Sequence, residues 1–248
     1  VAGGTPLEAF HWIEYCNSAR GLTELSKMRE KNGSPEPFGI KYWGVGNENN
    51  EYGGLMTPDE YSALYNRVTS LSLSLLDENS KTVASGPTWA VSDYSRQFFK
   101  SMSERGIGWG CKRLDGYSLH CYTVSDGADT DFTEEQWYAC LSEAAIMDRV
   151  IQDHINILND YDPKNHVKLY IDEWGNWTAF HSGQSWFNKP IFKQKGTVRE
   201  AIHAAMTLNI FNNNCDYVQV GCLTGLINYI HSPFLSNGKQ LIETPTYH

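Results

Sequence analysis

The feature that most constrains the fold is an alternation of capped helical segments with short apolar runs. The stretches "TPLE" at 5–8 and "TPDE" at 57–60 each place Thr at the N-cap, Pro at the first helical position and Glu where it completes a capping box. After the second box, apolar residues recur at helical spacing from Tyr61 to Leu75, which predicts a helix. A third box begins at Thr133 and opens a helix whose apolar face continues to Leu158, and a fourth helix is predicted over 197–213.

Five apolar runs of strand length alternate with these helices, at 40–45, 82–85, 117–120, 167–171 and 217–220. Strands separated by helices predict parallel βα units, in an open doubly wound sheet or a closed barrel. No GxGxxG or GxxxxGK[ST] follows a strand, which favours the barrel over a nucleotide-binding sheet. A complete (β/α)8 barrel needs eight strands, so either three strands are not recognised or the first part of the barrel lies outside this sequence. We favour the second interpretation, an α/β chain that forms an incomplete TIM barrel, about strands 4 to 8 with the preceding helix, in one domain over 1–248.

Composition narrows the classes of partner. There are 20 basic and 29 acidic residues, a formal charge of −9 without blocks of one sign, which argues against nucleic acid and anionic membranes. Aromatic residues make up 13% of the chain and suit either the stacking of sugar rings or a large core. The six cysteines show no CxxC pair and no disulfide framework, which favours a reduced compartment and so a cytoplasmic location over secretion.

Polar residues follow the predicted strands, where parallel α/β folds place their catalytic groups. The first run leads to Asn47 and Glu48, the third to His120 and Tyr122, and the fourth to Glu173. Two carboxylates at one end of a barrel are the groups needed for glycoside hydrolysis, and in retaining enzymes they lie about 5 to 5.5 Å apart. Either Glu alone could be an ion-paired strand end, but the whole set favours a catalytic site.

Five stretches of the sequence resemble one family, and they follow one another in the same order as in that family. The stretch "GSPEPFGIKYWGVGNENNEYGG" at 33–54 resembles the acid/base region of glycoside hydrolase family 51, the α-L-arabinofuranosidases, and "LYIDEWGNWT" at 169–178 resembles their nucleophile region. Further similarities are "HWIEYCN" at 11–17, "GYSLHCYT" at 116–123 and "ETPTY" at 243–247. The chain is therefore similar to the catalytic barrel portion of this family, without its first strands and its C-terminal β-sandwich.

The resemblance implies a retaining enzyme that removes terminal α-L-arabinofuranosyl residues from arabinoxylan, arabinan or their oligosaccharides. It implies Glu48 as acid/base, Glu173 as nucleophile, Asn47 as a binder of the hydroxyl next to the anomeric carbon, and His120 and Tyr122 as groups lining the glycone pocket. It implies no cofactor, and no set of residues at metal-ligand spacing is found. A homo-oligomer or a complementing N-terminal barrel segment is the expected protein partner.

Some positions depart from the family or stay open. Gly225, within "TGLIN" at 224–228, stands where the family usually carries a Gln. The segment after Trp174 fits a long loop that overhangs the site and either stacks on substrate or packs on itself; its aromatic residues are Trp177, Phe180, His181, Trp186 and Phe187. Trp89 is a further candidate for the cavity border. The sequon at 176–178 lies so close to Glu173 that we interpret it as chance.

Two alternatives remain at this point. Related barrels reuse the same two Glu residues, so an endo-β-1,4-glucanase or a β-xylosidase is the nearest enzymatic alternative. The other is an inactive fragment that needs another chain, because an incomplete barrel exposes a sheet edge and an apolar interior.

Overall fold

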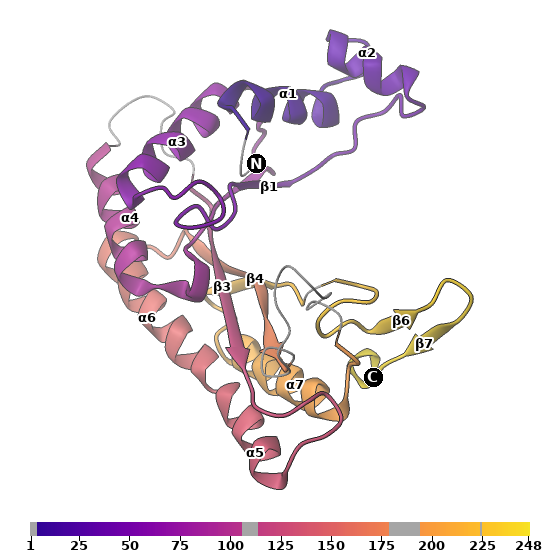
Figure 1. Cartoon of the computed structure of the whole chain (residues 1–248). Coiled ribbons are helices and arrows are strands. Elements are labelled where there is room, and N and C mark those ends of the chain that lie inside the picture. Colours follow the sequence, from indigo (N-terminus) through magenta and orange to yellow (C-terminus); the bar gives the residue numbers. More distant parts are fainter. Residues whose placement is uncertain (1–3, 106–113, 179–193, 224) are drawn as a thin grey trace. The chain divides into compact units, whose positions relative to one another are not determined.

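The computed structural model describes residues 4–105, 114–178, 194–223 and 225–248 (Figure 1). The chain divides into two compact units. Unit 1 comprises Val1–Ser118 and Ile157–Lys168, and unit 2 comprises Leu119–Asn156 and Leu169–His248. Among the described residues, no helix combines the length and the apolar character required to cross a membrane.

Unit 1 alternates helices with parallel strands, as the sequence predicts. Strand β1 pairs with β2, and β2 pairs with the start of β3, both in parallel. The predicted capping boxes at Thr5 and Thr57 are present. The elements are α1 (Pro6–Asn17), α2 (Glu24–Lys31), β1 (Tyr42–Val45), α3 (Pro58–Leu71), η1 (Leu73–Leu75), β2 (Lys81–Ala84), η2 (Thr88–Ala90), α4 (Ser92–Arg105) and the beginning of β3 (Gly116–Val124).

The core of unit 1 is aromatic and ties the helices to the ends of the strands. The Tyr61 ring of α3 stacks on Phe98 of α4 with 5.4 Å between centroids, and Phe98 stacks on Tyr117 of β3 at 5.3 Å. The Tyr61 hydroxyl donates to the carbonyl of Val45 at 2.5 Å and accepts from the N–H of Ser85 at 2.5 Å. One buried phenol thus fixes the carboxyl ends of β1 and β2, from which the functional loops start.

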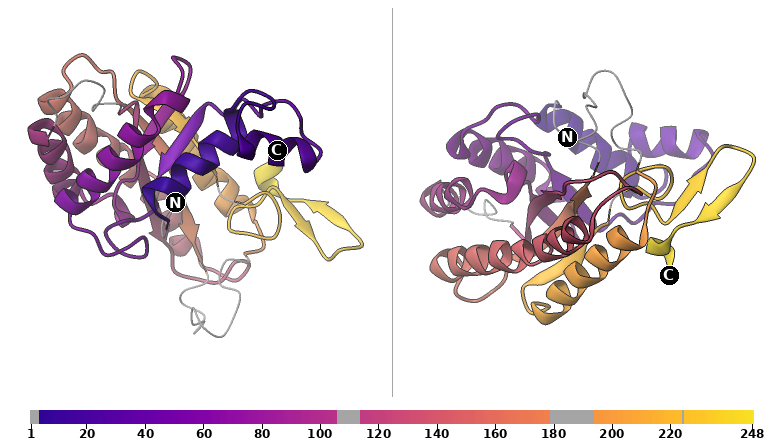
Figure 2. Two further views of the ribbon diagram at one scale, coloured as in Figure 1. Left: turned by 90° about the horizontal axis from the view of Figure 1, so that it is seen from above. Right: turned by 60° about the horizontal axis from the view of Figure 1, so that its bottom comes forward.

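Unit 2 continues β3 and adds two further strands of the sheet. Strand β4 pairs in parallel with β5, with a register shift between Leu169 and Tyr170. Both views in Figure 2 show β6 and β7 as a separate antiparallel ribbon, coloured yellow. The elements are α5 (Glu134–Glu143), α6 (Ile146–Tyr161, which passes into unit 1 at Ile157), β4 (Lys168–Trp177), α7 (Val198–Asn213), β5 (Val218–Gly221), β6 (Phe234–Ser236), β7 (Leu241–Glu243) and η4 (Pro245–Tyr247).

The single helix predicted after Thr133 is two helices in the structure, α5 and α6. The capping box at Thr133 is present, but the helix that starts there ends at Glu143, and α6 begins at Ile146. Between them the N–H groups of Ala144, Ala145 and Met147 each donate to a carbonyl three residues earlier. These tighter bonds interrupt the α-helical ladder. The apolar face that the sequence assigns to a single helix ending near Leu158 therefore belongs to two consecutive helices.

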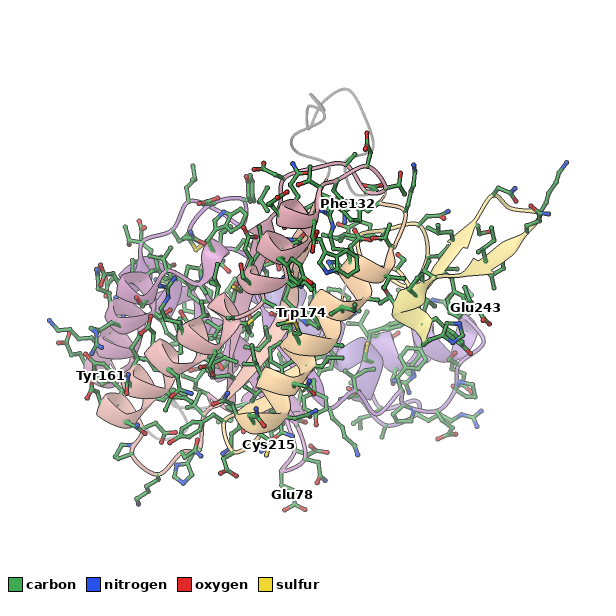
Figure 3. All side chains as sticks on the ribbon, turned by 90° about the horizontal axis from the view of Figure 1, so that it is seen from below. Glu78, Phe132, Tyr161, Trp174, Cys215 and Glu243 are labelled. Carbon is green, nitrogen blue, oxygen red and sulfur yellow. The ribbon has the colours of Figure 1, made fainter. Side chains whose placement is uncertain are left out.

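The α/β class is confirmed, and each of the five predicted strands has a counterpart. The largest difference is in β4, which extends to Trp177, well past the predicted end at residue 171. Trp174 of this strand is fully buried and packs edge-on against Phe211 of α7, with 5.2 Å between ring centroids (Figure 3). This contact fixes which face of β4 lies against the helix.

Candidate active site

The loop after β1 holds Asn47 and Glu48 in unit 1. Asn47 is exposed and Glu48 is half-buried, with a φ of 46° that is rare for a non-glycine residue. The Glu48 carbonyl accepts the N–H groups of Glu51 at 2.9 Å and Gly53 at 3.0 Å. A Cβ on Gly53 would lie 1.8 Å from the carbonyl oxygen of Asn47, so only glycine fits there. The loop is therefore folded tightly around the peptide that carries the predicted acid/base.

The loop after β2 is attached to the same region of unit 1. The Asn50 carboxamide oxygen accepts the Thr88 N–H at 2.9 Å and the Thr88 hydroxyl at 3.3 Å. Trp89 follows with a φ of 60°, and its side chain is 50% exposed. Left-handed backbone at such a residue persists only where the surroundings impose it. The structure thus presents the Trp89 side chain to solvent from a loop fixed to that of Glu48.

In unit 2, strands β3 and β4 bring together three of the predicted site residues. Trp174 faces α7, so strand alternation turns Glu173 to the opposite face of β4. There the Tyr122 hydroxyl donates to Glu173 Oε2 at 3.0 Å, and His120 Nδ1 lies 3.6 Å from the same oxygen. The other imidazole nitrogen of His120, Nε2, lies 3.3 Å from Asp172 Oδ1.

The burial of this cluster is uneven. The His120 side chain is 1% exposed, while the carboxylates of Glu173 and Asp172 are 36% and 41% exposed. Burial, and next the charge of Glu173, raise the pKa of the Tyr229 phenol. The Glu173 carboxylate is therefore partly exposed, and the Tyr122 hydroxyl holds its Oε2.

Trp177 corrects the predicted position of the aromatic loop. It is the last residue of β4 rather than the start of a loop, and it is 4% exposed. Its ring lies 5.5 Å from that of Tyr122, centroid to centroid. The structure therefore places Trp177 behind Tyr122, where it holds the phenol that contacts Glu173. Phe180, His181, Trp186 and Phe187 of the same predicted loop lie outside the described residues.

Sequence reasoning missed the role of Asn176 as a connecting residue. Its side chain is fully buried, and its Nδ2 donates to the hydroxyls of Thr123 and Ser125, each at 2.7 Å. A nitrogen enclosed in this way has no room for a glycan, which supports the interpretation of the sequon as chance. The backbone N–H of Asn176 donates to His231 Nε2 at 2.7 Å. Nothing in the sequence links residues so far apart.

Gly225, which replaces the Gln usual in the family, lies in a turn that packs on itself. Its carbonyl accepts the Ser232 hydroxyl at 2.8 Å. A Cβ on Gly225 would lie 2.9 Å from the Cβ of Tyr229. A side chain at this position would therefore displace Tyr229, the residue whose phenol pKa is raised in part by the charge of Glu173.

Comparisons with known proteins identify the family that this chain resembles. The sequence profile described as "Alpha-L-arabinofuranosidase 1 domain" matches residues 4–103, and "Alpha-L-arabinofuranosidase C-terminal domain" matches residues 172–248. An intracellular exo-alpha-L-arabinofuranosidase of Bacteroides ovatus is 31% identical over 100% of this chain and 47% of its own length. The crystal structure of a GH51 arabinofuranosidase from Xanthomonas axonopodis pv. citri superposes with a TM-score of 0.88 at 27% identity, over 100% of this chain and 49% of that one.

The chain belongs to glycoside hydrolase family 51. A second solved structure, the arabinose complex of the Thermotoga maritima alpha-L-arabinofuranosidase, matches with a TM-score of 0.78 at 25% identity, covering 100% of this chain and 46% of that one. The chain thus spans about half the length of the relatives it matches.

Proposed function

We propose that the protein carrying this chain is a retaining, exo-acting α-L-arabinofuranosidase that acts on arabinoxylan, arabinan or their oligosaccharides, with a catalytic domain that includes residues 1–248. The observation that carries the proposal is the Glu173 carboxylate on β4, held by the Tyr122 hydroxyl and facing buried His120 in a family 51 chain. The name of the Bacteroides ovatus relative supports the exo mode of action.

In the proposed reaction Glu173 is the nucleophile and Glu48 the acid/base. A Glu173 oxygen attacks the anomeric carbon while the glycosidic C–O bond breaks, and Glu48 gives its proton to the leaving oxygen. Glu48 then removes a proton from water, whose oxygen attacks the same carbon and releases the Glu173 carboxylate. Two displacements at one carbon retain its configuration.

The remaining candidates act on binding in this proposal. Asn47 binds the hydroxyl next to the anomeric carbon, and His120 contributes to the glycone pocket. Trp89, which is half exposed, stacks on the part of the saccharide beyond the cleaved bond. Trp177 acts on substrate through Tyr122, since its own ring is buried. The proposed chemistry calls for no metal or organic cofactor.

The test is covalent trapping in the intact protein with a cyclophellitol-type arabinofuranosyl probe, followed by peptide mapping. Label on Glu173, and its loss in Glu173→Gln, is the expected result. Label on any other residue would overturn the assignment. Nitrophenyl arabinofuranoside, nitrophenyl xyloside and cellulose serve as competing substrates, and preference for either of the last two would favour the xylosidase or glucanase alternative.

An apolar region of unit 1 bears on protein partners. A cavity of about 380 Å³ is lined mainly by residues of α1 and β1, and Trp12 and Tyr42 at its border are 58% and 55% exposed. We propose that a complementing barrel segment covers this face in the active protein, as expected for a sheet edge. Native mass spectrometry of a fully active particle that contains residues 1–248 and nothing else would contradict this.

A further inference from the structure

On its β5 side, the end of β4 lacks the strand pairing that holds its beginning. In the described residues, the β4–β5 register runs from Leu169 to Ile171 and stops where β5 ends at Gly221. Glu173 lies past that point. On the β3 side, the N–H of Ser125 donates to the carbonyl of Trp177 at 2.9 Å. Other groups must therefore hold the segment that immediately follows Glu173.

A buried imidazole takes the place of the missing strand partner. His231 is fully buried, and its Nε2 accepts the N–H of Asn176 at 2.7 Å. Burial, and next the neighbouring His203, lower the pKa of His231 to about 3, so the ring is neutral and Nε2 can act as the acceptor. The Asn176 carbonyl accepts from Gln194 Nε2 at 3.1 Å, so side chains satisfy both backbone groups of this residue.

The same imidazole also leaves no room for a side chain at Gly175, the residue before Asn176. Gly175 has a φ of 143°, and a Cβ added there would lie 2.8 Å from Cδ2 of the His231 ring. His231 therefore contacts the backbone of β4 through a hydrogen bond at one residue and by close packing at the one before. Both lie within three residues of Glu173.

A second buried histidine fixes the Asn176 side chain. Asn176 Nδ2 donates to Thr123 Oγ1 at 2.7 Å, and Thr123 Oγ1 lies 3.2 Å from His203 Nε2. Thr123 Oγ1 therefore joins the Asn176 carboxamide to the His203 ring. Burial lowers the pKa of His203 to about 4, which agrees with a neutral ring.

We propose that His231 is a positioning residue for Glu173: its neutral Nε2 replaces the missing strand partner and fixes the Gly175–Asn176 peptide, which sets the direction of the nucleophilic carboxylate. The inference rests on the proposed function and adds a residue to its site. His231 does not touch substrate in this proposal and acts only through β4.

The test compares three replacements of His231 in the intact protein. Gln places an amide oxygen near the position of Nε2, Asn is too short to reach it, and Leu fills the space without an acceptor. We expect kcat for nitrophenyl arabinofuranoside to fall at least about tenfold in His231→Leu and His231→Asn, with KM within about threefold of the wild type. His231→Gln should stay within about threefold of the wild-type kcat.

A matched control separates positioning from general loss of stability. His154 on α6 is also buried, at 1% exposure, and its Nδ1 contacts the Val150 carbonyl of its own helix. His154→Leu should lower the thermal midpoint while leaving kcat within about twofold. If His231→Leu does not fold, the Gln and Asn variants alone give the same comparison.

Different results would overturn the proposed function and the positioning role of His231. If the wild type does not cleave the arabinofuranoside, or Glu173→Ala leaves cleavage unchanged, the proposed function is wrong. If Glu173→Ala abolishes cleavage while folded His231→Leu keeps the wild-type kcat, or Gln restores no more than Asn, only the positioning role of His231 is wrong.

Discussion

Tyr122→Phe is the sharpest perturbation of the proposed site, because it removes one oxygen atom and keeps the ring. The lost hydroxyl donates to Glu173 Oε2 at 3.0 Å. A hydrogen bond to a charged group contributes about 1.5 to 3 kcal/mol. Since the Glu173 side chain is 36% exposed, water can replace part of the bond, and we take the lower end. A loss of about 1.5 kcal/mol corresponds to roughly a tenfold fall in kcat/KM.

The assay is kcat/KM for nitrophenyl arabinofuranoside, with thermal denaturation as a check on folding. The phenyl ring keeps its contact with Trp177, so the midpoint should stay close to that of the wild type. Tyr138→Phe on α5, where the side chain is 62% exposed, is the matched control and should leave kcat/KM unchanged. If Tyr122→Phe lies within about twofold of the wild type while Glu173→Ala is inactive, the hydroxyl does not orient the nucleophile.

Two further predictions concern stability. Gly175→Ala should lower the free energy of unfolding by about 2 kcal/mol more than Gly238→Ala. Both residues have a positive φ, but of the two only Gly175 has a close neighbour, because an added Cβ would lie 2.8 Å from His231 Cδ2. Equal losses in urea denaturation would contradict this steric overlap. Burial raises the pKa of Glu200 from 4.5 to about 7. Its protonated form is favoured in the folded state, so its contribution is full below pH 4.5 and is lost as the pH rises through about 7, by roughly 3 kcal/mol at most. Glu200→Gln should therefore show a smaller loss of stability than the wild type between pH 5 and pH 8, and an unchanged loss in denaturant titrations would refute this.

The elements that could be predicted from the sequence are those set by local chemistry. A capping box joins residues three apart, so the helix starts at Thr5, Thr57 and Thr133 are visible without tertiary information. Helix α2 was missed because its box pairs Thr23 with Ser26 instead of Glu and its face is mostly polar. Helix α4 starts at Ser92 without a recognised box.

The candidate site shows the same division. The family resemblance implied that His120 and Tyr122 line one pocket, and the structure brings both to Glu173. The position of Trp177 was wrong because β4 continues past β5 through contacts with β3 and side chains, which no local pattern encodes. The contact between His231 and Asn176 depends on the tertiary fold in the same way.

Two groups behind Glu173, His203 and His231, share one property: both are buried, and burial lowers their pKa values so that both are uncharged at neutral pH. Above pH 6.5 the unfolded-state histidines are largely neutral, so the low pKa values of His203 and His231, about 4 and about 3, affect stability only as the pH falls below 6.5. The raised pKa of Glu200 acts in the opposite direction, up to about pH 7. The opposing slopes give this part of unit 2 its greatest stability near pH 6.5. A network of neutral donors and acceptors can thus fix β4 firmly without placing a second charge behind the carboxylate that it positions.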